Sequence, residues 1–301
     1  MQGKRNVGIY VRAFRLPFIL ASILPFIFGS CIDKSSFLFM RFFIGLITVA
    51  LTHLGANLIN DYADSKYGAD WQDRKWHTFF GGSKLIQEGV LPERFYLNAA
   101  KFCFAAACAC ILLLSFILHN LLIIGLYALI LFLGFSYSHK PLVFSYRRLG
   151  ELIIFILFGP AVVMGGYFIQ TQIFPDPRSF ILSLPFGFFT TAILYSNEVP
   201  DFQDDLKAGK LTWVNFLGQE KAFLLYCILI FSGFFCIGLN IIIGNLSLIS
   251  ALAFIFIFPA LRAAYILRRF HDNKKALKGS SRITIALQAL VSIILIADIL
   301  L

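Results

Sequence analysis

Residues 37–58 read FLFMRFFIGLITVALTHLGANL, an apolar run whose single charged residue is Arg41. A helix of about 20 apolar residues is long enough to cross the roughly 30 Å hydrocarbon core of a membrane. The polar segment Ile59-Asn60-Asp61-Tyr62-Ala63-Asp64 follows at once. This stretch therefore predicts a membrane helix that ends in an acidic cluster.

Apolar runs of similar length recur along the whole chain. Hydrophobic residues make up 59% of the sequence, charged residues 14%, and the mean hydropathy is +0.80, which excludes a soluble domain of 301 residues. Strand-length alternation is missing, which favours a helical bundle over a β-barrel. We predict an all-α polytopic membrane protein that forms one domain over residues 1–301. Its nine transmembrane helices are expected at 15–32, 37–58, 97–118, 121–139, 149–171, 179–196, 222–241, 245–266 and 282–301.

Basic residues predict how this bundle is oriented. With the N-terminus inside, 23 of the 26 Lys and Arg residues fall on the inner side, and only Lys34, Arg41 and Arg178 fall outside. Because Lys and Arg collect on the cytoplasmic side, we expect a multi-pass protein of the cell inner or plasma membrane whose N-terminus is cytoplasmic. The net charge of +10 is explained by contact with anionic lipid and requires no nucleic acid. The first apolar run lacks a small-residue cleavage site and is expected to be a retained helix.

Acidic residues are distributed differently from basic ones. Eleven of the sixteen lie between residues 61 and 93 or between 198 and 220, on the inner side after predicted helices 2 and 6. The second segment reads Asn197-Glu-Val-Pro-Asp201-Phe-Gln-Asp204-Asp205, with Asn and Asp at intervals of four that share one helical face. Helix capping is the alternative explanation, but one cap for each helix end would be enough.

Two such clusters on one membrane face indicate a shared site for cations and a polyanion. Mg²⁺ prefers oxygen ligands and is usually held by one or two carboxylates together with substrate phosphates. Basic residues near the same face, including Lys84, Lys140, Arg147 and Lys210, are candidates for neutralising the remaining phosphate oxygens. For Lys140 and Arg147, ordinary positive charge of an inner loop is an equally good explanation.

These segments resemble the UbiA superfamily of intramembrane prenyltransferases, in which two Asp-rich motifs follow helices 2 and 6 of a nine-helix bundle. The similarity covers roughly residues 50–220. It is carried by the motifs from Asn57 to Asp70 and from Asn197 to Thr212, and by the segments 149–152, 158–161 and 166–171. Residues 81–89, GGSKLIQEG, resemble the 1,4-dihydroxy-2-naphthoate branch; the Asn-Arg-Pro-Leu of hydroxybenzoate enzymes is absent. Lys84 departs from the Arg that related sequences often carry.

The resemblance implies Mg²⁺-dependent transfer of a polyprenyl group from its diphosphate to 1,4-dihydroxy-2-naphthoate, with decarboxylation, in menaquinone biosynthesis. It implies that the catalytic residues are Asp61, Asp64, Asp201 and Asp205, and that the metal ligands are these four with Asn57 and Asn197. Asp204 and Asp70 are second choices. The expected diphosphate contacts are Lys84, Lys140, Arg147 and Lys210, and the expected acceptor pocket is Gly81, Gly82 and Ser83.

Other functions remain open at this point. The acceptor could instead be 4-hydroxybenzoate, homogentisate or a glycerol phosphate. An ion-coupled transporter is a distant alternative, because its acidic site would lie near the membrane midplane. A membrane scaffold without catalysis is another. The six cysteines lack a CxxC pair and are interpreted as packing residues, and the five histidines are interpreted as structural or solvated.

Overall fold

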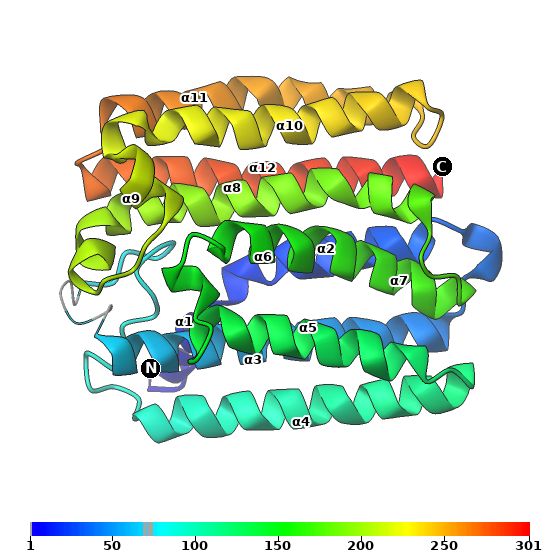
Figure 1. The fold of residues 1–301 in the computed structure, drawn as a ribbon, viewed down its shortest axis with the longest axis horizontal. Coiled ribbons are helices and arrows are strands. Elements are labelled where there is room, and N and C mark those ends of the chain that lie inside the picture. Colours follow the sequence, from blue (N-terminus) through cyan, green and yellow to red (C-terminus); the bar gives the residue numbers. More distant parts are fainter. Residues whose placement is uncertain (1, 69–70, 72–74) are drawn as a thin grey trace.

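The computed structural model describes residues 2–68, 71 and 75–301, and the regular secondary structure of that part of the chain is helical, with one isolated bridge between Arg147 and Leu211. The helices lie side by side, with their connecting loops gathered at the two ends of the bundle (Figure 1). Their bounds are α1 Gln2–Ala13, α2 Leu20–Cys31, α3 Phe39–Tyr67, α4 Glu93–Leu118, α5 Leu122–Ser138, α6 Gly150–Ile156, α7 Val162–Thr171, α8 Pro177–Lys207, α9 Trp213–Leu217, α10 Ala222–Ile242, α11 Ile257–Arg269 and α12 Lys274–Leu300.

Each predicted apolar run corresponds to a helix or a bent helix. Among the described residues, seven helices are long and apolar enough to cross a membrane, and a bent pair formed by Val7–Ala13 and Leu16–Cys31 raises this number to eight. The remaining run is α5, a shorter apolar helix of 17 residues, at the lower end of the length needed to span. The predicted all-α membrane fold is confirmed, and the count of nine is approximate.

Glycines at helix crossings bring neighbouring helices close together. A Cβ at Gly29 of α2 would lie 2.1 Å from the carbonyl oxygen of Val163 in α7, and a Cβ at Gly159 would lie 2.8 Å from Cα of Gly187 in α8. Small residues at such crossings let the backbones of membrane helices approach, which is how these helices gain packing without a hydrophobic driving force. Large apolar side chains point outward instead, and Phe102, Phe116 and Phe235 are each at least 70% exposed.

Two irregular segments interrupt the helices. Between α1 and α2 the chain bends by 52° at Arg15, whose φ of 50° is left-handed, and continues as the 3-10 turn Leu16–Phe18. Between α6 and α7, residues Leu157–Ala161 form a π-helical stretch that contains Pro160. Such stretches are common at functional sites. Arg15 and Phe158 both line the same polar cavity, so both irregularities lie at the site described next.

Candidate active site

A polar cavity of about 230 Å³ lies between the last turns of α3 and α8. Both helices end near the bundle end at the left of Figure 1, where the loops that follow them also gather. The predicted juxtaposition of the two acidic segments is thus what the fold produces.

The end of α8 contributes one continuous polar face to this cavity. Its five acidic and amide side chains in the lining are Asn197, Glu198, Asp201, Asp204 and Asp205. Pro200 lies within the helix, and α8 continues to Lys207 without a break. Within the described residues, Asn197 Oδ1 and Asp205 Oδ2 are buried without a hydrogen-bond partner. Unsatisfied buried oxygen atoms of this kind are free to accept a cation, which is an observation that fits Mg²⁺.

The end of α3 contributes fewer of its predicted ligands. Asn57, Asn60 and Asp64 line the cavity, and Tyr146 Oη donates to Asp64 Oδ1 over 3.4 Å. Burial raises the pKa of Tyr146 and the charge of Asp64 raises it further, so the phenol keeps its proton. Asp61 is not among the described lining residues, and its side chain is buried, with 2% of the residue exposed.

Asp61 is held by Arg15 and by the loop at Ser83. Its Oδ1 accepts a hydrogen bond in an ion pair with the Arg15 guanidinium, and its Oδ2 accepts from Ser83 N over 3.2 Å. A buried carboxylate needs such compensation because losing water is costly. The predicted metal role of Asp61 therefore has no support from its placement and stays a prediction.

The loop of residues 81–84 joins the two acidic segments. Gly81 N donates to Asp201 Oδ2 over 3.0 Å, while Ser83 N reaches Asp61. Gly81 has φ 71°, and a Cβ there would lie 3.5 Å from Asp201 Oδ1, so glycine suits this turn. Of the predicted acceptor pocket, Gly81 and Gly82 line the cavity; Ser83 does not, and its hydroxyl bonds Tyr96 Oη at 2.6 Å.

Two of the four predicted diphosphate-binding residues reach the cavity. Lys84 and Lys210 line it, and Lys210 Nζ lies 3.4 Å from Asp205 Oδ1. Burial alone would lower the pKa of Lys210, but the adjacent Asp205 and Asp64 carboxylates outweigh burial and raise the pKa well above its usual value. Its ammonium is therefore a permanent charge at physiological pH.

The other two predicted contacts are on the surface. Lys140 and Arg147 are exposed and are absent from the described lining of the cavity. The guanidinium of Arg147 donates to the Pro141 carbonyl at 2.9 Å, and Lys140 Nζ lies 5.7 Å above the Tyr67 ring. Their diphosphate contact stays a prediction without geometric support. Asp70, a second-choice ligand, lies outside the described residues.

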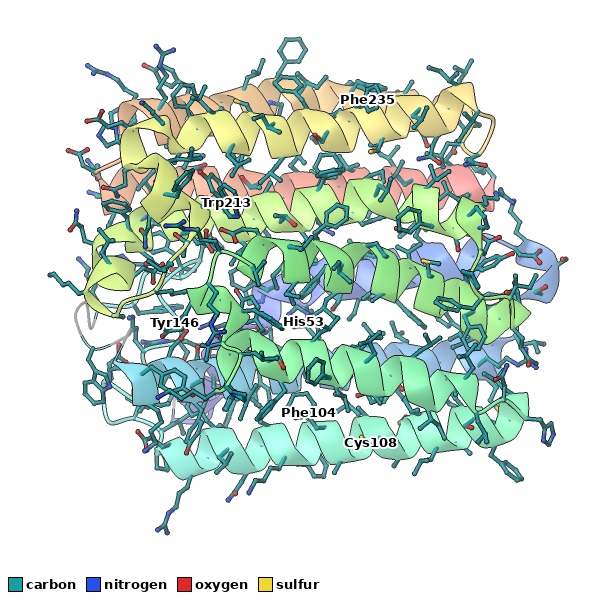
Figure 2. The ribbon with its side chains drawn as sticks, in the orientation of Figure 1. His53, Phe104, Cys108, Tyr146, Trp213 and Phe235 are labelled. Carbon is teal, nitrogen blue, oxygen red and sulfur yellow. The ribbon has the colours of Figure 1, made fainter. Side chains whose placement is uncertain are left out.

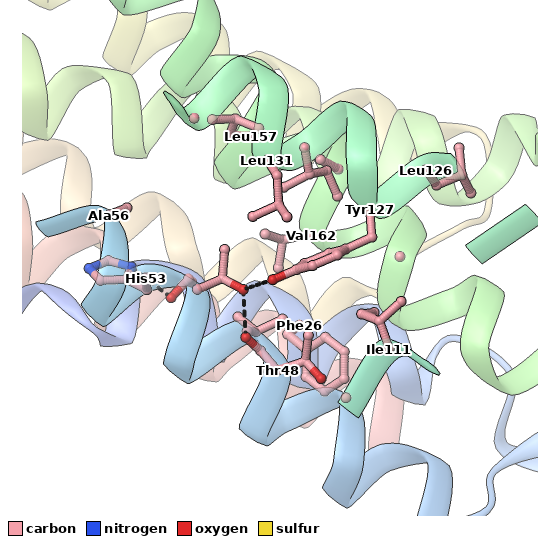
Figure 3. A pocket seen from close by; sticks show the side chains of 18 of the residues that line it. Phe26, Thr48, His53, Ala56, Ile111, Leu126, Tyr127, Leu131, Leu157 and Val162 are labelled. Atoms are coloured by element: carbon pink, nitrogen blue, oxygen red, sulfur yellow. Dashed lines mark hydrogen bonds between the residues drawn. The ribbon is translucent and has the colours of Figure 1, made fainter. Parts of the chain in front are cut away.

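An apolar cavity of about 340 Å³ adjoins the polar one (Figure 3). Five residues line both cavities, so the two cavities are immediate neighbours. These shared residues are His53, Ala56, Gly134, Leu157 and Phe158. Beyond them the wall is almost entirely aliphatic and aromatic. A molecule with an anionic head and a long hydrocarbon tail fits this pair of cavities.

Sequence reasoning missed His53, Phe158 and Glu198 as lining residues. For His53 a signal existed, because His53, Asn57, Asn60 and Asp64 follow one another at steps of four, three and four, which is the stripe of a single helical face. For Glu198, which is buried, the same signal existed, because Glu198, Asp201 and Asp205 follow one another at steps of three and four.

No three His, Cys, Asp or Glu side chains among the described residues lie close enough to hold one metal ion by themselves. Mg²⁺ usually takes few protein ligands and completes its coordination shell with water and substrate phosphates. Asn197 and Asp205 supply the open oxygen atoms for such a site.

Comparison with known proteins identifies the family. Residues 22–287 match the UbiA prenyltransferase family. The chain is 28% identical over 234 residues to UbiA prenyltransferase domain-containing protein 1 of Xenopus tropicalis, covering 76% of this chain and 65% of that protein. It therefore spans slightly less than two thirds of that relative's length.

Solved structures show the same fold. A UbiA homologue from Aeropyrum pernix K1 superposes with a TM-score of 0.71 at 16% identity, covering 93% of this chain and 96% of that one. A UbiA homologue from Archaeoglobus fulgidus bound to DMAPP and Mg²⁺ gives 0.55 at 16% identity, covering 96% and 99%. Together with its apolar helices, this fold makes the chain a multi-pass integral membrane protein. The chain belongs to the UbiA prenyltransferase family.

Proposed function

We propose that this chain is a Mg²⁺-dependent prenyltransferase that moves a polyprenyl group from its diphosphate to 1,4-dihydroxy-2-naphthoate, in menaquinone biosynthesis. The observation that carries the proposal is the acidic polar cavity that lies directly beside an apolar one and shares five lining residues with it. The family supports the reaction type, and the homologue that binds DMAPP and Mg²⁺ supports the prenyl diphosphate and the metal.

The donor would lie across both cavities. Lys84 and Lys210 would bind its diphosphate, and the polyprenyl tail would occupy the apolar cavity behind Ala56 and Leu157. Asn57, Asp64, Asn197, Asp201 and Asp205 would hold Mg²⁺, with Asp204 beside them. Mg²⁺ supplies Lewis-acid neutralisation of the departing pyrophosphate.

The bond that breaks joins prenyl C1 to the diphosphate oxygen, and C1 would therefore sit where the two cavities meet. Aromatic and aliphatic side chains at this position, such as Phe158 and Leu157, would keep water from the electron-poor C1. The ring carbon that bears the carboxylate would form the new bond to C1. Carbon dioxide then leaves, its bonding electrons restore the aromatic ring, and pyrophosphate is the other product.

The naphthoate acceptor is supported by the GGSKLIQEG segment and by the room beside it. Gly81 and Gly82 line the polar cavity without side chains, so a two-ring acceptor would meet no clash there. The acceptor's carboxylate would also be attracted to the cations of that cavity.

The test compares acceptors with the purified protein in detergent. One polyprenyl diphosphate is offered with 1,4-dihydroxy-2-naphthoate or with 4-hydroxybenzoate, in Mg²⁺ and in EDTA. The proposal predicts prenylated naphthol and carbon dioxide with the first acceptor only, and no product in EDTA. A preference for 4-hydroxybenzoate would reject the menaquinone assignment and keep the prenyltransferase. Absence of transfer to either ring would reject the menaquinone assignment and leave homogentisate or a glycerol phosphate as the acceptors to test.

The same proposal places the N-terminus and both acidic segments on the cytoplasmic side of the cell inner or plasma membrane, because of the 23 to 3 distribution of basic residues. Single cysteines at the exposed positions Lys66 and Lys207, in a background lacking the native six, should react only with a membrane-permeant thiol reagent. A cysteine at exposed Ser35, at the opposite end of the bundle, is the control that an impermeant reagent should label. The reverse pattern would overturn this orientation.

A further inference from the structure

One histidine lies where the two cavities meet, and the proposed function gives it no role. His53 lines both cavities and is 7% exposed. It sits on α3 one turn before Asn57, deeper in the bundle than Tyr146 (Figure 2). Because the diphosphate belongs to one cavity and the tail to the other, this position is next to the prenyl C1 that reacts.

The hydrogen bonds of His53 define which of its two ring nitrogens is left without a partner. Its Nδ1 lies 2.9 Å from Ser22 Oγ. Ser22 Oγ in turn lies 3.0 Å from the carbonyl oxygen of Ile19. Within the described part of the chain, Nε2 is buried without a hydrogen-bond partner. The Ser22 hydroxyl has one hydrogen, so the two contacts are both hydrogen bonds only if Nδ1 donates to Ser22 and Ser22 donates to Ile19.

This arrangement makes Nε2 an acceptor. The opposite tautomer would form one hydrogen bond fewer and would leave a buried N–H without an acceptor. A second proton on the ring would bury a charge among apolar groups, which costs more still. The Phe158 ring packs edge-on against the imidazole, at 5.4 Å between centroids and 90° between planes, and fixes its orientation.

The donor substrate cannot satisfy this nitrogen. Diphosphate oxygens are acceptors, as Nε2 is, and a polyprenyl chain has no hydrogen to donate. An aromatic acceptor that carries a hydroxyl group does have one, and it must bring its ring to C1 for reaction. The chemistry of Nε2 and its position therefore select the same ligand.

We propose that His53 binds the aromatic acceptor, with Nε2 accepting a hydrogen bond from a ring hydroxyl and orienting the ring against the prenyl C1. This inference rests on the proposed function and names the residue by which that site recognises its second substrate. It predicts selectivity for hydroxylated rings over rings of the same shape without hydroxyl groups.

The test measures binding rather than turnover. Dissociation constants are determined by equilibrium dialysis, in detergent with Mg²⁺ and an unreactive thiolodiphosphate analogue of the prenyl donor, for 2-naphthoate and for its 1-hydroxy and 4-hydroxy derivatives. The wild type should bind at least one hydroxylated compound about tenfold more tightly than 2-naphthoate, the size expected for one buried hydrogen bond. His53→Phe, which keeps a ring and removes both nitrogens, should lose that preference and still bind 2-naphthoate and the prenyl diphosphate.

Three further variants separate recognition from folding. His53→Gln keeps an acceptor and should retain part of the preference, and Ser22→Ala, which releases Nδ1, should reduce it. His119→Asn is the matched control. His119 is exposed at the far end of α4 in a left-handed conformation that Asn tolerates, so this change should leave all the dissociation constants unaltered.

Several results would overturn the proposal. If His53→Phe still binds hydroxylated naphthoates more tightly than 2-naphthoate, Nε2 binds only water and another group binds the ring hydroxyl. If His53→Phe weakens every ligand equally, prenyl diphosphate included, the histidine supports the fold. If the wild type binds no naphthoate, the naphthoate assignment fails, and the same comparison with 4-hydroxybenzoate and benzoate tests His53 separately. Equal affinity for these two then overturns the His53 proposal as well.

Discussion

The ends of α3 and α8 carry similar acidic sequences but present them differently. On α8, Asn197, Asp201, Asp204 and Asp205 all face the polar cavity, and two of their oxygen atoms have no partner among the described residues. On α3, the most buried carboxylate, Asp61, is turned to Arg15 and the loop at Ser83. The same residue types at the same spacing thus support a binding face in one helix and a structural anchor in the other.

The difference shows how a cluster of negative charge is made compatible with a buried site. A buried carboxylate requires a nearby cation or hydrogen-bond donors. Arg15 satisfies Asp61. On α8, Asp205 pairs with Lys210, Asp201 accepts from the Gly81 amide and Asp204 pairs with Lys274, while Asn197 Oδ1 and Asp205 Oδ2 keep no hydrogen-bond partner among the described residues. We infer that the α8 face is the main metal-binding surface and that the anchor at Asp61 holds the loop that covers it.

The largest effect should come from the α8 face. Asp201→Asn removes a negative charge from the cavity but keeps the shape of the side chain, so turnover should fall about 1000-fold, as when a group that stabilises transition-state charge is lost. Single-turnover rates in saturating Mg²⁺ measure this.

Asp176→Asn is the matched control, because Asp176 caps the opposite end of the same helix by accepting from Ser179 N and Asn is an equally good cap. Control activity should equal that of the wild type. Near-normal rates for Asp201→Asn would exclude this carboxylate from the metal site.

A smaller loss is expected at the cation that faces those acids. Lys210→Gln should raise the KM for the prenyl diphosphate about 30-fold, because it removes a buried charge that would pair with phosphate, and should change the acceptor KM little. An equal rise in both constants would instead indicate a general disturbance of the cavity.

Lys210 also leads to a prediction of how protein stability depends on pH. Its pKa is raised above the unfolded value of about 10.4, so its contribution to stability is fully present below that value and is lost only as pH rises through the folded pKa. The difference in thermal unfolding between wild type and Lys210→Gln should therefore not decrease as the pH rises from 7 to 9. A difference that shrinks within this window would show that the lysine loses its proton there.

Much of the fold follows from the sequence because about 20 apolar residues in a row have few alternatives to crossing a membrane. The ends of α3 and α8 could be predicted to meet through their charge. The orientation of Asp61 could not be predicted, because Asn57 and Asp61 share one helical face by periodicity. Whether Asp61 faces the cavity or serves as an anchor depends on Arg15, which lies 46 residues away in the sequence. His53 was passed over for a similar reason: a single histidine in an apolar run looks like a core residue until its partners are known.

The anchor itself can be tested by a double-variant cycle. Asp61→Asn leaves the Arg15 guanidinium without its counter-charge and should lower the free energy of unfolding by about 3 kcal/mol, with a roughly tenfold loss of activity through the displaced loop. Adding Arg15→Gln should restore part of both. Unfolding is followed by thermal melting in detergent, and activity by prenyl transfer.

The cycle also distinguishes the two explanations of Asp61. If Asp61 is instead a metal ligand, the double variant will recover stability but not activity, and Asp61→Asn alone will shift the Mg²⁺ concentration that gives half-maximal rate. An unchanged Mg²⁺ requirement together with shared recovery would confirm the contrast between the two helix ends.

The smallest effect is expected at the third inner loop. Lys140 and Arg147 are exposed, and the Arg147 guanidinium is engaged by the Pro141 carbonyl on the same loop. Solvent-exposed charges of this kind contribute little because water and salt screen them. Lys140→Gln and Arg147→Gln should therefore leave kcat/KM for the prenyl diphosphate within about twofold of the wild type. A rise of tenfold or more in the diphosphate KM for either variant would mean that this loop moves onto the bound substrate. The comparison of α3 with α8 would then have to include this loop as a third segment, one that reaches the site only when substrate is bound.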